Sequence, residues 1–158
     1  MTVAWQLRAA AAALILPPAI RLTSFARLMT WLTPRPPGSA PRKRATAVAL
    51  DDKAVARWVS RILHRLPEPW HLSCLNRSVV LYHLLRRAGR PVELCIGVTR
   101  AGGGVGSVTR VGRDGPHITA HAWLELDGAP YLESDTHFVT RLPVVARFPD
   151  APRLAPTT

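Results

Sequence analysis

Apolar residues recur at three- and four-residue intervals through the first half of the chain, the spacing of helices that bury one face. Near the N-terminus this pattern predicts two short amphipathic helices, over 3–16 and 19–32. Pro17 and Pro18 separate them, because proline interrupts a helix. The first apolar run is too short to span a bilayer, so both helices are expected to pack on the domain, with membrane-surface contact as the lesser alternative.

Two longer helices are predicted before the strands. One covers 52–65, where Asp51 supplies an N-cap and the apolar residues form a single stripe. The other begins near Cys74, and its leucine-rich sequence covers more than one face, so it is expected to be largely buried. Gly89 is a C-cap signal for this helix, and Pro91 stops it.

The pattern then changes to that of β-strands. Residues 92–99 are rich in β-branched and other apolar residues. Residues 117–126 predict the first arm of a hairpin, with a turn at Asp127 and Gly128 and a partner strand that starts near Ala129. Helices followed by antiparallel strands are typical of an α+β fold.

Composition divides the chain into four parts. Helices occupy 1–33, a Pro- and Arg-rich linker covers 34–48, and the core is expected over 49–148. The chain from residue 145 is Pro-rich and expected to be irregular, and 149–158 is assigned as an irregular tail. With 158 residues, 47% of them hydrophobic, the chain is long enough for one such core.

The charge balance restricts the partners. The chain has 21 Lys and Arg residues against 10 Asp and Glu, and its formal net charge of +11 favours acidic partners. Nucleic acid is not expected, because the only tight basic cluster is 42–44 and no nucleic-acid-binding motif is present. The two cysteines, Cys74 and Cys95, form no CxxC pair and are too few for a disulfide framework, so a reducing, cytoplasmic setting is predicted.

Cys74 is a candidate nucleophile, since the dipole and free N–H groups of a helix N-terminus favour a thiolate and can hold an oxyanion. It needs a base, and His121 on the predicted hairpin can supply one. A three-residue turn would place Glu133 opposite His121 and Asp135 diagonal to it, whereas a two-residue turn would place Ser134 there. The orienting carboxylate is therefore either Glu133 or Asp135.

Simpler interpretations of the same residues compete with catalysis. Cys74 can be an ordinary buried residue and His121 a structural histidine, and Cys95 is expected in the core. His117 shares a strand face with His121 and is a second candidate base. A zinc site of His71 with Cys74, Cys95 and His121 is disfavoured, because no pair has the spacing of known zinc motifs.

Two ordered blocks resemble a known family. CLNRSVVLYHLLRRAGRPVELCIGV, residues 74–98, resembles the cysteine-helix-strand segment of the transglutaminase-like leader peptidases of lasso-peptide biosynthesis, and HAWLELDG, residues 121–128, resembles their histidine strand. The resemblance implies a papain-like, transglutaminase-like α+β fold in which Cys74 is the nucleophile and His121 the general base. The family usually carries an Asp where this chain has Glu133.

The resemblance also implies a reaction, in which the leader is removed from a ribosomally made lasso-peptide precursor. Cys74 attacks the bond between leader and core, and water then releases the leader from the acyl-enzyme. A separate macrolactam-forming cyclase uses ATP to join the freed core amine to an Asp or Glu side chain. The peptidase chemistry needs no metal or organic cofactor. Because no β-rich segment precedes residue 50, a separate leader-recognition protein is expected, with the N-terminal helices as a docking surface for it or for the cyclase.

Two other classes of function use the same residues differently. Another transglutaminase-like amide hydrolysis or acyl transfer would employ the same cysteine and histidine on a different peptide. A non-catalytic scaffold that only binds peptide would make Cys74 dispensable.

Overall fold

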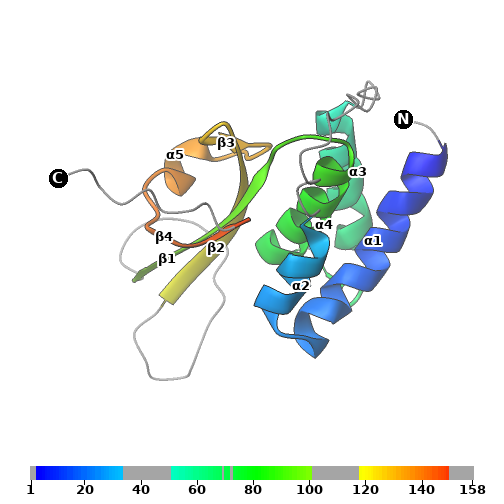
Figure 1. Ribbon diagram of the computed structural model, residues 1–158, viewed down its shortest axis with the longest axis horizontal. Coiled ribbons are helices and arrows are strands. Elements are labelled where there is room, and N and C mark those ends of the chain that lie inside the picture. Colours follow the sequence, from blue (N-terminus) through cyan, green and yellow to red (C-terminus); the bar gives the residue numbers. More distant parts are fainter. Residues whose placement is uncertain (1–2, 34–50, 69, 72, 101–117, 150–158) are drawn as a thin grey trace, which may run out of the picture.

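The computed structural model describes residues 3–33, 51–68, 70–71, 73–100 and 118–149, and its helices lie together on one side of a small antiparallel sheet (Figure 1). The α+β class is therefore confirmed. A short helix, α5, covers the opposite side of the sheet. The elements in chain order are α1 (Val3–Leu22), α2 (Phe25–Leu32), α3 (Asp52–Arg65), α4 (Cys74–Arg87), β1 (Glu93–Arg100), β2 (Ile118–Leu126), β3 (Ala129–Tyr131), α5 (Thr136–Val139) and β4 (Val144–Phe148).

The first helix differs from the prediction. Instead of ending at the prolines, α1 continues through Pro17 and Pro18 to Leu22, and the break falls before α2. Proline has no N–H, so Pro18 leaves the carbonyl of Leu14 without its usual helical donor. The indole Nε1 of Trp70 donates a hydrogen bond of 2.6 Å to this carbonyl. A donor from outside the helix thus replaces the missing one.

The continuous α1 also changes the membrane expectation. With 20 residues and a mean hydropathy of 1.4, it is long and apolar enough to cross a membrane by length and composition, which is weak evidence by itself. One of its faces is buried on α3 and α4 and belongs to the main core. Its other face leaves apolar side chains exposed, namely Val3, Leu7, Leu14, Ile15 and Leu22.

The limits of α3 and α4 follow from local signals, as predicted. The carboxylate of Asp51 accepts a hydrogen bond from the N–H of Ala54 and caps α3. The hydroxyl of Ser73 does the same for α4 by accepting from the N–H of Asn76 at 3.1 Å. Gly89 adopts a φ of +86° just after α4, the left-handed conformation typical of a helix C-terminus.

The strand order in the sheet is β3-β2-β1-β4, and all pairs are antiparallel. The hairpin between β2 and β3 has a two-residue turn, in which Asp127 and Gly128 both have positive φ and Leu126 faces Ala129. Continued further, this register would place Ser134 opposite His121. The pairing ends at Tyr131, however, and Leu132 turns the chain with a φ of +60°.

The end of the described chain corrects another prediction. The sequence predicts an irregular segment from 145, but Val144–Phe148 forms β4 and pairs with β1. Arg147 on β4 makes ion pairs with both Glu93 and Glu125, which fastens this edge strand to β1 and β2. The short helix α5 was not predicted, because four residues are too few to show helical periodicity.

Several predictions fall on parts of the chain that lie outside the described residues. They are the linker over 34–48, the basic cluster 42–44, His117 and all but the first residue of the tail over 149–158. The division of the chain into these four parts stays a prediction.

Candidate active site

Cys74 is the first residue of α4, and its side chain is half-buried. The preceding Ser73 directs its hydroxyl to the N–H of Asn76 and so fixes the start of the helix beside the thiol. The thiol lies within hydrogen-bonding contact of the imidazole of His121 and of the backbone N–H groups of Ala122 and Leu75. Residues distant in the sequence, from α4 and β2, therefore meet at this sulfur.

These contacts favour the thiolate. Burial disfavours the charged form, but the hydrogen bond from His121, the N–H of Ala122, the positive charge of His121 and the N–H of Leu75 together outweigh it. The pKa of the Cys74 thiol is consequently lowered from its ordinary value. The dipole of α4 acts in the same direction, because its positive end lies at Cys74.

The helix reaches the sheet because β3 is short. β3 pairs with β2 only over Leu124–Leu126, which leaves the outer edge of β2 without a strand partner at Ala122. The first turns of α4 occupy this edge: the hydroxyl of Ser78 donates a hydrogen bond of 2.9 Å to the carbonyl of Ala122, and the N–H of Ala122 points to the thiol of Cys74. The end of β3 thus creates the place where the thiol meets the histidine.

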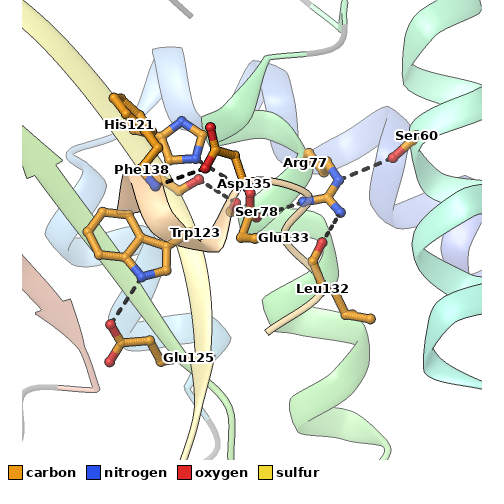
Figure 2. Close-up of polar contacts among 11 residues, drawn as sticks. Ser60, Arg77, Ser78, His121, Trp123, Glu125, Leu132, Glu133, Asp135 and Phe138 are labelled. Atoms are coloured by element: carbon orange, nitrogen blue, oxygen red, sulfur yellow. Dashed lines mark hydrogen bonds and ion pairs between the residues drawn. The ribbon is translucent and has the colours of Figure 1, made fainter. Parts of the chain in front are cut away.

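His121 lies between aromatic side chains. Its ring stacks on Trp123 at a centroid distance of 6.1 Å, and Phe138 of α5 meets it edge-on at 5.8 Å. The indole of Trp123 is itself held by a hydrogen bond of 3.0 Å to Glu125 (Figure 2). These contacts restrict the orientation of the imidazole and leave its side chain only 16% exposed.

The two nitrogens of the His121 ring have different surroundings. Nε2 lies 3.5 Å from a carboxylate oxygen of Glu133. Nδ1 is buried and has no partner of regular hydrogen-bond geometry among the described residues, so the contact between the imidazole and the Cys74 thiol is looser than a regular hydrogen bond. Hydrogen bonding to Cys74 and to Glu133 outweighs burial and raises the pKa of His121 to about 9.

Glu133 is held from behind by Arg77. The guanidinium of Arg77, on α4, donates a hydrogen bond of 2.9 Å to the Glu133 carboxylate, one of 2.6 Å to the carbonyl of Leu132 and one of 3.2 Å to the hydroxyl of Ser60 on α3. Figure 2 shows this arginine between α3 and the segment that follows β3. The pair is largely buried, with side-chain exposures of 21% for Arg77 and 10% for Glu133.

Asp135 has another position. It is exposed, and its carboxylate accepts a hydrogen bond of 2.9 Å from the N–H of Phe138, which caps α5. Asp135 therefore positions the helix that carries Phe138, and Phe138 in turn contacts His121. Of the two candidate carboxylates, the structure brings Glu133 to the ring of His121.

Glu133 reaches His121 by a route that neither register predicted. The two-residue turn that the structure contains would have put Ser134 opposite His121. The left-handed Leu132 ends the strand and redirects the chain, so the next side chain approaches Nε2. A non-glycine residue with positive φ is uncommon. At Leu132 this conformation is accompanied by the hydrogen bond that Arg77 donates to the Leu132 carbonyl.

Cys74, His121 and Glu133 line a cavity of about 330 Å³, together with Ser60, Arg77, Ala122, Leu132 and Ser134. The other cysteine, Cys95, is fully buried in a small second core with Trp123, Val139 and Leu142. Burial raises the pKa of Cys95 to about 12, so this thiol stays protonated. Within the described ranges, no cluster of three or more His, Cys, Asp or Glu side chains could hold a metal ion.

The arrangement can perform nucleophilic chemistry. It joins a low-pKa thiol to a histidine of raised pKa, with a buried carboxylate on the far side of that histidine. The first N–H groups of α4 have no acceptor within the helix and lie beside the sulfur, where an oxyanion would form. Such a set supports attack on an amide carbonyl and formation of a thioester.

Two features of the site were missed by the sequence interpretation. Arg77 belongs to the Cys-Leu-Asn-Arg-Ser run at the start of the Cys74 helix, and its position three residues after Cys74 places it on the same helix face. This spacing could have identified it. Phe138 gave no signal, because its role depends on the packing of α5 against β2.

The family to which these features belong follows from comparison with known proteins. The family model described as "transglutaminase-like superfamily" matches residues 11–144. The chain therefore belongs to the transglutaminase-like superfamily, a group whose members are typically cysteine-dependent hydrolases or transferases. No match was found to a curated protein or to a solved structure.

Proposed function

We propose that this protein is a cysteine peptidase that removes the leader from a lasso-peptide precursor. The observation that carries the catalytic part is the contact between the Cys74 thiol and His121, with Glu133 3.5 Å from the other ring nitrogen. The choice of substrate is supported by the resemblance of 74–98 and 121–128 to leader peptidases of lasso-peptide biosynthesis.

In the proposed reaction, the thiolate of Cys74 attacks the carbonyl carbon of the last leader residue. The negative charge that develops on the oxygen is held by N–H groups at the start of α4. His121 gives its proton to the amine of the first core residue as the amide bond breaks, which leaves the leader as a thioester on Cys74. His121 then takes a proton from water, which hydrolyses the thioester and returns the thiol. Glu133 keeps the imidazole oriented through both steps.

The product determines the partners. Its free core amine is the group that a macrolactam-forming cyclase joins to a side-chain carboxylate, so the peptidase acts before the cyclase, in the cytoplasm where the precursor is made. We propose that a separate leader-recognition protein presents the precursor. No metal or organic cofactor takes part in these steps.

The exposed apolar face of α1 is the proposed docking surface for the leader-recognition protein. Deleting the first 33 residues would remove core side chains as well, so substitutions at the exposed Leu7 and Leu14 are the better test. Replacing both with Ser is expected to weaken pull-down of the recognition protein without lowering the melting temperature. Unchanged pull-down would contradict this docking surface.

The test of the reaction is mass spectrometry of a lasso precursor incubated with the protein and its leader-recognition partner. We expect one cut at the leader–core junction, lost in Cys74→Ala and in His121→Ala and kept in Cys95→Ala. A leader with a free carboxylate indicates hydrolysis, whereas a leader joined to an added amine indicates acyl transfer. Absence of any cut by a folded wild-type chain, with the correct precursor and partner present, would contradict the proposal.

A further inference from the structure

A groove with exposed basic residues adjoins the candidate active site along α3. It encloses about 810 Å³, and its wall includes Lys53, Arg57, Arg61 and His64 of α3. Ser60, Arg77 and Glu133, which line the cavity around Cys74, line this groove too. The two hollows therefore adjoin each other along a shared wall.

The basic residues form one stripe. Lys53, Arg57, Arg61 and His64 follow one another at spacings of four, four and three, which places them on one face of the helix. At about 1.5 Å per residue the stripe is about 16 Å long, which corresponds to about five residues of an extended peptide. The groove thus has the length of a short peptide segment.

The positive charges of Lys53, Arg57 and Arg61 are not neutralised by the described part of the chain. Arg57 has only a distant partner, Asp51 at 3.9 Å, and both side chains are 65% exposed, so the pair contributes little. Among the described residues, Lys53 and Arg61 have no carboxylate within 4 Å. The nearby Asp52 is occupied by Arg90 and the hydroxyl of Tyr131, and Glu133 by Arg77.

We propose that this groove binds an acidic segment of the peptide substrate, about five residues long and adjacent to the bond that is cleaved. The inference rests on the proposed function and adds a substrate class to it: precursors with Asp or Glu in that segment. The basic side chains of the groove select among peptides by charge. Because the groove shares a wall with the thiol site, the contacts around Cys74 still determine which peptide bond is placed at the thiol.

The experiment measures binding separately from cleavage. A fluorescein-labelled peptide with Glu at alternate positions, and its counterpart with Gln, are titrated by fluorescence anisotropy into full-length Cys74→Ser protein. We expect the Glu peptide to bind about tenfold more tightly, and the difference to disappear in Lys53→Gln/Arg57→Gln/Arg61→Gln and at high salt. The matched control, Arg8→Gln/Arg27→Gln/Arg87→Gln, removes the same net charge from α1, α2 and α4 and is expected to keep the preference.

Each alternative outcome has a separate meaning. Equal binding of the two peptides, or an equal loss in the control variant, would overturn the acidic-segment proposal and leave the peptidase proposal untouched. Tighter binding of a single-stranded oligonucleotide of the same charge would also overturn it, by assigning the groove to nucleic acid. If the protein prefers the Glu peptide but the wild type does not cut the precursor, the proposed function is contradicted. The proposal that the groove binds acidic peptide segments then still stands.

Discussion

Arg77 and Glu133 form a largely buried ion pair of 2.9 Å, and the same carboxylate lies 3.5 Å from the imidazole of His121. Arg77 stands on the helix that begins with Cys74, so one helix carries both the thiol and the group that holds the carboxylate. The distance between Cys74 and the His121–Glu133 pair is thereby linked to the geometry of α4.

Replacing Arg77 with Lys is expected to disturb this link. A lysine cannot bond Glu133, Leu132 and Ser60 together, because it lacks the planar fork of donors. We expect kcat to fall by about tenfold and the free energy of unfolding by about 1–3 kcal/mol, since a mostly buried carboxylate loses part of its pairing. Peptidase assays and thermal melts measure the two effects. The control is Arg87→Lys, an exposed position on the same helix, and equal effects in the two variants would contradict the role of Arg77.

The two carboxylates near α5 are expected to respond differently. Glu133→Gln removes the negative charge beside His121, so we expect kcat to fall by about 10²- to 10⁴-fold while the fold persists. Asp135→Asn keeps a side chain that can cap α5 and is expected to leave kcat within about threefold of the wild-type value. Steady-state kinetics on both variants checks this. A larger loss in Asp135→Asn than in Glu133→Gln would reverse the assignment.

The pKa values predict a pH dependence for the reactivity of Cys74. Its lowered pKa means that the thiolate is present well below the pH at which an ordinary cysteine ionises. The imidazolium of His121 persists until the pH rises through about 9. Peptidase activity, which uses both charged forms, is therefore expected to rise through the Cys74 pKa and to decline near pH 9.

This profile can be measured in two ways: by the rate of peptide cleavage, and by the rate at which iodoacetamide alkylates each of the two cysteines. Cys95 is the internal control: it is buried with a pKa of about 12 and is expected to stay unmodified in the native protein over the same range. In Glu133→Gln the declining limb is expected to move to lower pH, because Glu133 helps to raise the pKa of His121. If Cys74 is alkylated with the pH dependence of a free thiol, that result would contradict the pairing of a Cys74 thiolate with a His121 imidazolium.

The continuity of α1 provides a test of the fold. Trp70→Phe removes the hydrogen bond to the Leu14 carbonyl, and we expect the free energy of unfolding to fall by about 1–2 kcal/mol. In a Pro18→Ala background the new N–H can donate to that carbonyl within the helix, so Trp70→Phe is expected to cost less there. Urea denaturation of the four proteins of this double-mutant cycle measures the difference. Additive effects would show that Trp70 does not replace the missing donor.

Local signals in the sequence were sufficient for several elements of the fold. The start of α3 at Asp52 and of α4 at Cys74, and the end of α4 before Gly89, depend on caps and apolar spacing that lie within a few residues of each boundary. Cys74 and His121 are candidates from the sequence as well, because a cysteine at a helix N-terminus needs a base and the predicted hairpin contains a histidine, and the structure places the two in contact.

The remaining features depended on contacts between residues far apart in the chain. The passage of α1 through Pro17 and Pro18 involves Trp70, more than fifty positions away, and β4 exists because β1 had a free edge to pair with. The position of Glu133 was decided where β3 ends and Leu132 turns, beside the guanidinium of Arg77. Which chemical groups are present, and which helices carry them, follows from the sequence alone. Which carboxylate meets His121 depends on where strand pairing stops and on a side chain from another element, and both arise only when the chain has folded.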